Sequence, residues 1–558
     1  MKIGKRGLML LLSTLLVGTL AVGCSSSSSQ DAKTEGTEND VLKLAWTSDI
    51  KLTDPTHAYD GATKDLLANI MEGLFMLDEN DQAIPALAQS YEFNEETLTY
   101  TFKIREGIKW FKTVDGKAEE TGDVVDAHDF EYAWKRQADP KTGSQQAQFL
   151  DYAGIKNYKE IFAGTKQPGE LGIKALDDYT LEVQLERNVP YLESLLAMPS
   201  FYPISEDFVK EVEASGKTFG TSIDTTLSFG AYIIEEWRTD ESLDFVKNDS
   251  YWDAENVDAE RVEIIINKDT ASSRNLYEAG DIDKVGLSSD DAQMFKDSKE
   301  FKSTLGSAAT SLKFNVKDEV ASNVNLRRAI SMAIDKQQYV DSVVNNGSIV
   351  ATGIIPEGFT FGPDGKDFRE SYKGVNLNLE SAQKEFEEAK KALGDNIEIE
   401  LLLTDSAGDK KNGEYLQSQL EKNLPGIKVS IKQVPFKNRL DLETEGNYQM
   451  VLCTYGLNYT DPMALLELWV SDSAINNAFY NNPEYDKLVA DAKVENNPET
   501  RWQMLLDAEK LFVEQDAVKV PIVQGAKTFL IKENITNYQI NKTAYADVWK
   551  SVEFKDAK

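Results

Sequence analysis

Short stretches of alternating apolar and polar residues indicate β-strands with one buried face. Residues 98–104 alternate strictly, and residues 179–185 and 262–266 repeat the period of two. Between the first two stretches, residues 127–134 carry apolar side chains at helical spacing. This mixture predicts that residues 72–211 form an α+β lobe of their own.

A strand, a helix and a second strand follow one another in the second half of the chain. Residues 397–403 form an apolar strand, residues 414–423 a helix with one apolar face, and residues 427–431 another strand. This order predicts a parallel, right-handed βαβ unit. Cys453 lies in the apolar run that follows and is predicted to be a buried strand residue.

Two further helices are predicted from apolar positions three and four residues apart. Residues 326–343 carry Ala, Ile and Val on one side and are predicted to form one helix. Residues 379–393 have the same spacing, and Gly394 follows where a helix C-cap belongs.

The first residues have the pattern of an export signal. Lys2, Lys5 and Arg6 precede an apolar run over residues 8–22, which is too short to span a bilayer comfortably. The small residues before Cys24 look like the lipobox at which bacteria attach a diacylglyceryl group and then cleave. We therefore expect residues 1–23 to be a signal peptide and Cys24 to be lipidated, against the alternative of an ordinary signal peptide with an incidental cysteine.

Composition describes a flexible tether followed by a large globular body. Residues 25–40 are polar, without an apolar pattern, and the folded part is expected to begin near Val41. The chain is 41% hydrophobic, which is typical of a globular protein. Its 558 residues exceed what one hydrophobic core ordinarily holds, so two or more lobes are expected. No second apolar segment approaches 18 residues, so only the lipid anchor would contact the membrane.

Charge and motifs exclude several classes of function. The formal charge of −34 argues against binding of nucleic acid, which needs clustered Lys and Arg. The two histidines, His57 and His128, lack neighbours for a zinc site or a catalytic triad, and His128 is predicted to be a helix-start residue. The chain has no G-x-S-x-G, Walker or G-x-G-x-x-G motif. We therefore expect a binding protein without a metal or other cofactor, rather than the rival class of a secreted hydrolase.

Several short motifs, in a fixed order along the chain, carry a family resemblance. They include Asp54-Pro55, Glu72-Gly73-Leu74-Phe75, Pro85-Ala86-Leu87-Ala88, Tyr100 to Gly107 with Lys109-Trp110, Ala127-His128-Asp129-Phe130, Ala138-Asp139-Pro140, Gly172 to Asp178, Gly230-Ala231-Tyr232, Asn248-x-x-Tyr251-Trp252, Asn325 to Ile330, Ala333-Ile334-Asp335 and Asn458 to Pro462. Together they resemble the oligopeptide-binding proteins of the extracellular solute-binding family 5, which serves ABC importers.

The resemblance implies a mixed α/β, three-domain fold of the type II periplasmic-binding-protein kind. Two jaws, domains I and III, would close on a hinge and enclose the ligand in a cleft between them. By motif position, domain I takes residues 41–71, 212–306 and 525–558, domain II residues 72–211, and domain III residues 307–524. The βαβ unit then falls in domain III.

The resemblance also implies the ligand site. Tyr59-Asp60-Gly61 would be the strand edge of domain I, and Thr454-Tyr455-Gly456 the strand edge of domain III. A peptide would add to these edges as a strand, so that its backbone supplies the affinity. The other residues carried over from the family are Gln146, Asn458, Tyr459 and Asp461.

Two positions depart from the family pattern. Asn458 stands where many peptide binders have an Asp that pairs with the α-amino group of the ligand, and Gln146 stands where Tyr is frequent. A neutral amide makes a weaker contact with an ammonium group than a carboxylate does. The sequence therefore predicts a weaker dependence on a free α-amine.

The resemblance predicts a monomer on the extracellular face of the cytoplasmic membrane, anchored by lipid, in a Gram-positive setting. It would capture short peptides for the permease and ATPase subunits of an ABC importer. The alternatives within the fold are a receptor for a signalling peptide such as a pheromone, an oligosaccharide binder, or a nickel-chelate binder. For a sugar, the stacking aromatics would be Trp46, Tyr59, Tyr455 and Trp469.

Overall fold

The computed structural model describes residues 40–555. A four-stranded sheet has the order β1 (Val41–Trp46), β12 (Arg261–Ile266), β11 (Ser242–Lys247) and β10 (Tyr232–Arg238). β1 pairs with β12 in parallel, and the other neighbours are antiparallel. The strand predicted at residues 262–266 is confirmed, and the sheet joins two segments that the sequence assigned to domain I.

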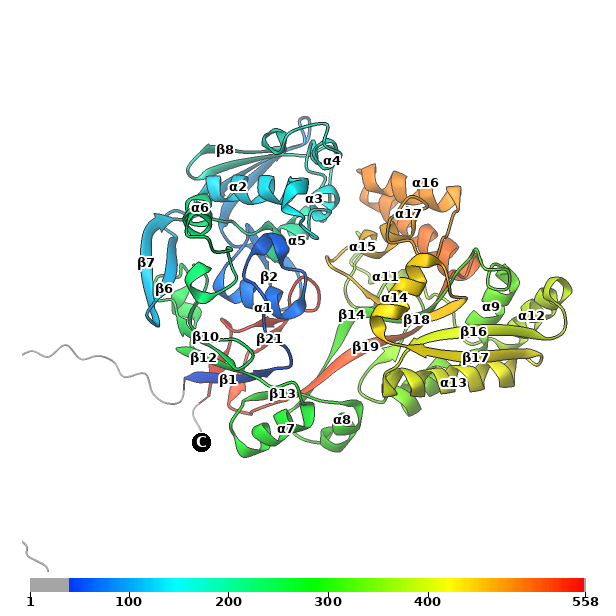
Figure 1. Cartoon of the computed structure of the whole chain (residues 1–558). Helices are drawn as coiled ribbons and strands as arrows, with labels where there is room; N and C mark the ends of the chain where they lie inside the picture. Colours follow the sequence, from blue (N-terminus) through cyan, green and yellow to red (C-terminus); the bar gives the residue numbers. More distant parts are fainter. Residues whose placement is uncertain (1–39, 556–558) are drawn as a thin grey trace, which may run out of the picture. The chain divides into compact units, whose positions relative to one another are not determined.

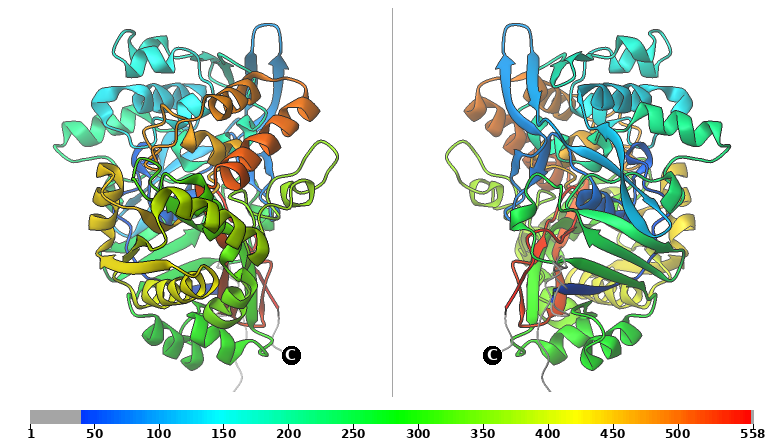
Figure 2. Two further views of the ribbon diagram at one scale, coloured as in Figure 1. Left: turned by 90° about the vertical axis from the view of Figure 1, so that its right-hand side faces the viewer. Right: turned by 90° about the vertical axis from the view of Figure 1, so that its left-hand side faces the viewer.

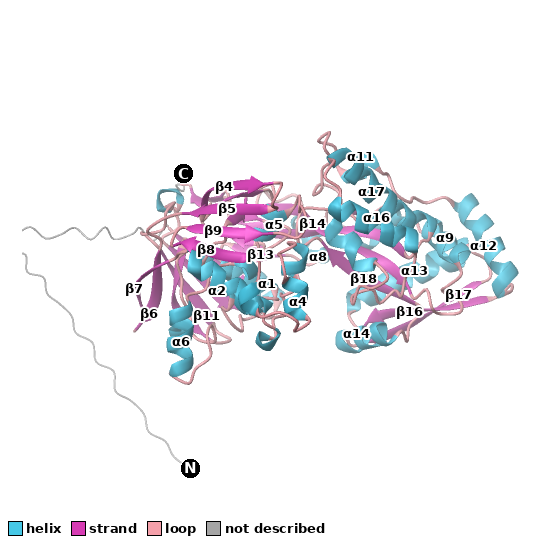
Figure 3. Ribbon diagram, turned by 90° about the horizontal axis from the view of Figure 1, so that it is seen from above, coloured by secondary structure: helices cyan, strands magenta, loops and turns pink. Residues whose placement is uncertain are grey.

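A second four-stranded sheet lies within residues 72–211. Its antiparallel strands have the order β4 (Ala88–Asn94), β5 (Thr99–Ile104), β9 (Thr180–Gln184) and β8 (Ile173–Asp177), and they lie side by side in Figure 3. Two of them confirm the predicted alternating strands. α2 (Ala127–Ala138) begins at a capping box, in which Asp126 accepts hydrogen bonds from the backbone of His128 and Asp129. His128 is a helix-start residue, as predicted.

The largest sheet has seven strands, and most of them come from residues 301–531. β16 and β17 pair in parallel over their whole length, and α13, which connects them, contacts both. Figure 2 shows this unit in yellow, and it confirms the predicted βαβ arrangement with its helix beginning earlier than residue 414. The strand order is β13 (Lys284–Gly286), β19 (Lys519–Ile531), β14 (Phe301–Phe314), β18 (Met450–Gly456), β16 (Ile397–Thr404) and β17 (Ile427–Val434), with β15 (Ile349–Val350) on β19 and α13 at Ala407–Asn423.

The single helix predicted at residues 326–343 is wrong, because the chain breaks there. α9 (Val324–Ala333) ends at Ile334, whose backbone is extended. Asp335 then caps α10 (Lys336–Tyr339) by accepting a hydrogen bond from the backbone N–H of Gln338, and a π-helical turn follows. The apolar period continues across the break, so the pattern alone does not reveal it.

The amphipathic helix upstream of the βαβ unit is confirmed. α12 (Leu379–Leu393) buries Ala382, Phe386 and Ala389, and Gly394 follows with φ +89°. That left-handed backbone favours glycine because it has no Cβ atom.

Two long strands run between the segments assigned to domains I and III. β14 and β19 pair antiparallel from Phe301 to Lys313, with a shift of register between Leu305 and Ala309 (Figure 1). Gly306 and Gly525 lie at this irregularity, beside the predicted domain boundaries. The pair is the structural candidate for the predicted hinge.

The remaining elements complete the described chain, in which no helix is long and apolar enough to cross a membrane. The strands are β2 (Phe75–Leu77), β3 (Ala83–Pro85), β6 (Lys109–Val114), β7 (Lys117–Val124), β20 (Ile535–Thr536), β21 (Gln539–Ile540), β22 (Asp547–Val548) and β23 (Glu553–Phe554). The helices are α1 (Gly61–Ile70), α3 (Phe149–Tyr152), α4 (Tyr158–Phe162), α5 (Leu192–Leu196), α6 (Glu206–Ala214), α7 (Thr270–Ala279), α8 (Ser289–Phe295), α11 (Phe368–Ser371), α14 (Phe436–Glu445), α15 (Met463–Leu466), α16 (Pro483–Val494) and α17 (Pro498–Lys510).

Candidate functional site

The end of β18 has one free edge. β14 pairs with the whole strand, whereas β16 pairs only with Met450 and Val451. The N–H of Leu457 donates to the carbonyl of Ser307, so hydrogen-bonded pairs alternate from there back along the strand. The backbone N–H and C=O groups of Thr454 and Gly456 therefore point away from β14. This edge is the one that the family resemblance assigns to domain III.

A large cavity opens beside this edge. Its volume is about 1010 Å³, and Thr454 and Tyr455 line it together with the first turn of α13 and the exposed side of α14. Parallel strands β16 and β18 both end here, which is where α/β folds bind ligands. Phe436 and Leu440 of α14 are exposed and present apolar surface to the cavity.

A second cavity, of about 750 Å³, adjoins the first. Residues of domain I line it, among them Trp46, Gly61 and Asp65. The two cavities share Ser288, Ser289, Asn346 and Ala526 as lining residues, so they form one continuous cleft. The cleft thus has the free edge of β18 on one side and the start of α1 on the other.

In this structure the segment Tyr59-Asp60-Gly61, which was predicted as the strand edge of domain I, is a loop followed by the start of a helix. Tyr59 is a loop residue with 48% of its side chain exposed, and Gly61 is the first residue of α1. Asp60 caps this helix by accepting hydrogen bonds from the backbone N–H and the hydroxyl of Thr63. The backbone of Asp60 is nevertheless extended, and Gly61 lines the cleft, so the role of this segment as a ligand edge stays a prediction.

The predicted ligand-binding residues that follow β18 lie in different environments. Asn458 is exposed, whereas Tyr459 is buried, stacks on Tyr191 at 4.6 Å and donates a hydrogen bond to Glu467. Because burial and nearby carboxylates disfavour its ionised form, the pKa of Tyr459 lies well above the ordinary value. Tyr459 is therefore a packing residue here and does not line the cleft.

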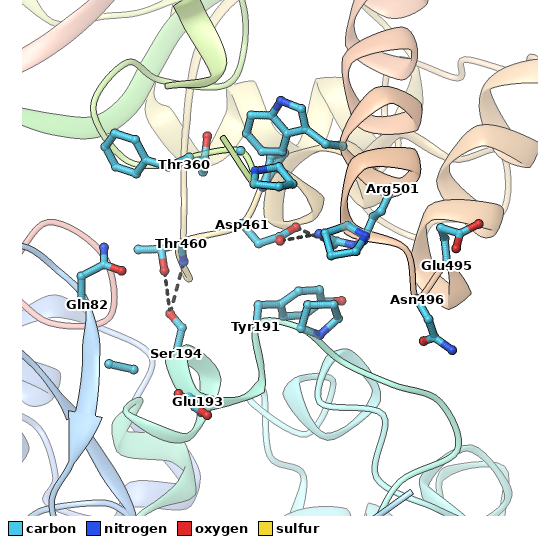
Figure 4. A pocket seen from close by; sticks show the side chains of 18 residues that line it. Gln82, Tyr191, Glu193, Ser194, Thr360, Thr460, Asp461, Glu495, Asn496 and Arg501 are labelled. Carbon is cyan, nitrogen blue, oxygen red and sulfur yellow. Dashed lines mark hydrogen bonds and ion pairs between the residues drawn. The ribbon is translucent and has the colours of Figure 1, made fainter. Parts of the chain in front are cut away.

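Asp461 is also engaged in a structural contact. Its two carboxylate oxygens accept hydrogen bonds from the guanidinium of Arg501 at 2.8 and 2.9 Å. The pair lines a third cavity of about 410 Å³, where Thr460 also donates a hydrogen bond to Ser194 (Figure 4). This cavity lies between residues assigned to domains II and III, so Asp461 is not available to a ligand in the cleft.

Gln146 is buried, and only some of the aromatic residues proposed for sugar binding line the cleft. Gln146 is 7% exposed, and its backbone carbonyl accepts a hydrogen bond from Gln137. Of the residues proposed to stack on a sugar, Trp46 and Tyr455 line the cleft, whereas Trp469 is fully buried. Among residues 40–555 no group of three or more His, Cys, Asp and Glu could hold a metal ion.

A buried cluster of charged side chains lies behind Tyr455 and was not predicted. Lys313 of β14 forms an ion pair with Glu443 of α14 at 2.6 Å, and Arg439 contacts the same carboxylate at 3.3 Å. Lys519 of β19 is paired with Lys313 on the neighbouring strand β14. Burial lowers the pKa of Lys519 to about 8. The available signal was a pair of lysines inside otherwise apolar strands.

Known proteins resemble this chain in sequence over most of its length. A model of the family described as bacterial extracellular solute-binding proteins, family 5, matches residues 82–477. The dipeptide-binding protein DppE of Bacillus subtilis is 30% identical over 552 residues, which cover 98% of each chain.

Solved structures give the same result. The structure of Listeria monocytogenes OppA bound to peptide is similar, with a TM-score of 0.75, 34% identity, and coverage of 93% of this chain and 100% of that one. The peptide-binding pheromone receptor PrgZ is similar with a TM-score of 0.76 and 31% identity over the same shares. The mixed α/β, multidomain periplasmic-binding fold expected from the sequence is confirmed.

Proposed function

This chain belongs to the bacterial extracellular solute-binding proteins of family 5, and on that premise we propose that it captures extracellular oligopeptides and delivers them to an ABC importer. The observation that carries the proposal is the free edge of β18. The unpaired backbone groups of Thr454 and Gly456 lie on this edge, and Thr454 lines a cleft of two adjoining cavities. A peptide backbone supplies the complementary groups whatever its sequence.

The energetics favour closure as part of binding. Each backbone hydrogen bond contributes only about 0.5–1.5 kcal/mol, whereas a micromolar complex requires roughly 8 kcal/mol. The edge of β18 can provide only a few such bonds, so much of the affinity must come from burial of the ligand between the jaws. In the present state α1 starts where the second edge was expected, and closure about β14 and β19 would bring Gly61 toward the ligand.

We expect side chains of the ligand to lie in the roomy parts of the cleft. The first cavity has both polar walls and exposed apolar side chains such as Phe436 and Leu440. Bridging waters can fill the space that a small side chain leaves. Such a site tolerates many sequences, as nutrient uptake requires.

Native mass spectrometry of residues 25–558, purified without denaturant, tests the proposal directly. A heterogeneous set of short peptides after acid release would support broad peptide capture and would give the preferred length. Hexose-spaced masses would favour the oligosaccharide alternative. An empty protein that binds no peptide in later titrations would refute the proposal.

A proline at the free edge tests the mode of binding. Thr454→Pro removes one N–H from the ligand side of β18 and leaves the pairing with β14, so peptide affinity should fall about tenfold. The control is Thr310→Val, which removes the same hydrogen bond between the hydroxyls of Thr310 and Thr454 but keeps the backbone donor. A folded Thr454→Pro variant with unchanged affinity would contradict strand addition.

A receptor for a signalling peptide is the second candidate, and the likeness to PrgZ favours it. The two functions differ in selectivity. The test is to identify the peptides bound to protein purified from its native host. A single peptide sequence, in place of a mixture, would support the signalling function.

The proposed location is the outer face of the cytoplasmic membrane, with a lipid anchor at Cys24. Residues 1–39, which contain the predicted signal peptide, Cys24 and most of the tether, lie outside the described residues. Detergent phase partitioning of the wild type and of Cys24→Ala tests the anchor. We expect the wild type in the detergent phase and the variant in the aqueous phase, because acyl chains supply the membrane affinity.

A further inference from the structure

The wall of the cleft behind Tyr455 contains more positive than negative charge. The side chains of Lys313, Lys519, Arg439 and Glu443 are all at most 8% exposed. Three are cationic and one is anionic. Glu443 accepts a hydrogen bond from Lys313 and forms the ion pair with Arg439, so its charge is shared between them.

The ammonium group of Lys519 has no carboxylate partner among residues 40–555. It lies 4.2 Å from the ring centre of Tyr455 and 4.8 Å from that of Trp469, and Glu443 attracts it without forming a salt bridge with it. Cation–π contacts compensate only part of the cost of burying a charge. The hydroxyl of Ser311, on the same face of the sheet, is also buried without a hydrogen-bond partner.

The nearby carboxylates do not offset this excess. Asp461 is paired with Arg501, and Glu467 is paired with Lys493 at 2.9 Å. Asn458, at the position where many relatives have an acidic residue, is neutral. The buried charge behind Tyr455 is therefore net positive, opposite in sign to the formal charge of −34 of the whole chain, whereas the carboxylates of Asp290 and Asp409 line other walls of the same cavity.

We propose that the Tyr455 side of the cleft selects for a carboxylate of the bound peptide, and that Lys519 is the specificity-determining residue. This inference rests on the proposed peptide binding. Tyr455 lies between the ammonium group and the cleft, and it lines both the 1010 Å³ cavity and a neighbouring cavity of about 570 Å³. Arg439 and Glu443 line the first of these, and Asn477, which accepts a hydrogen bond from Lys313, lines the second.

The expected preference is moderate, because the ligand does not touch the ammonium. A carboxylate on the cleft side of the Tyr455 ring lies on the order of 8 Å from the charge. At the effective dielectric of such sites this separation corresponds to roughly 30-fold in affinity, which screening by solvent in the open cleft reduces to about tenfold. Burial, together with the nearby charge of Lys313, lowers the pKa of Lys519, and a bound carboxylate would raise it again.

The test is competition between synthetic pentapeptides that differ in a single charge. One series exchanges Glu for Gln at each position, and another exchanges a free C-terminus for an amide. For the wild type, we expect about tenfold tighter binding of the acidic member at one position, or of the free acid, and the responsive series identifies which carboxylate is used.

Lys519→Met and Lys519→Gln should reduce this preference to less than twofold, and Lys519→Arg should retain it. The matched control is Lys411→Met, since Lys411 lines the same cavity but is exposed and screened by solvent. Equal affinities within each pair for the wild type, or a preference that persists in folded Lys519→Met, would overturn the inference. If no pentapeptide binds the wild type at all, the proposed function fails instead.

Discussion

Lys336 allows a direct test of how burial affects a charge in this protein. The side chain is 3% exposed, and its ammonium donates a single hydrogen bond of 2.9 Å, to the carbonyl of Val375. Burial lowers the pKa of Lys336 from its ordinary value to about 7. Each unit of difference from the unfolded chain corresponds to about 1.4 kcal/mol, so the charged form costs the folded state on the order of 4–5 kcal/mol.

The dependence on pH follows from which state holds the proton. Below pH 7 Lys336 is protonated in both the folded and the unfolded state, so the folded state is destabilised by the full cost of the buried charge. Between about pH 7 and pH 10 the unfolded chain binds a proton that the folded protein has lost, so the contribution of Lys336 to stability increases with pH. Lys336→Met removes the cost but leaves the carbonyl of Val375 without this donor, which costs about 1–3 kcal/mol.

We therefore expect Lys336→Met to be more stable than the wild type by about 2 kcal/mol at pH 6–7, and to lose this advantage by pH 10. Urea unfolding of both proteins at several pH values measures the difference. Lys384→Met is the control, because Lys384 lies exposed on α12 and should change neither stability nor its pH dependence. A difference between wild type and Lys336→Met that stays constant from pH 6 to pH 10 would refute the reasoning.

Three further predictions concern ligand binding and packing. N-acetylation of a bound peptide should weaken binding by less than tenfold, because Asn458 brings no charge, and calorimetry with both peptides would show a larger loss if this is incorrect. Arg501→Met should destabilise the protein by about 3–5 kcal/mol in denaturant unfolding, because it leaves the carboxylate of Asp461 buried without its partner. Gly374→Ala should lower the melting temperature, because its φ is +65° and the added Cβ would lie 2.1 Å from the carbonyl oxygen of Thr352, whereas exposed Gly169→Ala should not.

Local patterns were sufficient for several of the regular elements. The alternation at residues 98–104 and 262–266 corresponds to β5 and β12, and α12 ends at the predicted Gly394. These signals are local because a strand or helix must bury one face, and the period of apolar residues records that requirement. The break between α9 and α10 shows the limit, since Asp335 caps a new helix within an unbroken apolar period.

The order of motifs was sufficient for the family, because many weak matches in one order are rarely a coincidence. The motifs did not determine which of their residues face the ligand. Tyr459 and Asp461 stand in the motif as plausible ligand residues, yet the structure uses them for stacking on Tyr191 and for pairing with Arg501. Those partners are distant in sequence, so only the tertiary structure brings them together.

The sequence by itself determined the βαβ unit and, through the order of its motifs, the class of fold, whereas the free edge at the end of β18 is apparent only from the strand pairing. Only the tertiary structure decided the electrostatics of the site. Lys313, Lys519 and Glu443 come from three separate elements, and their effect on a ligand depends on their mutual distances and on exclusion of water. Neither quantity is encoded in a local pattern, because both arise when β14 and β19 pair and α14 packs against the sheet.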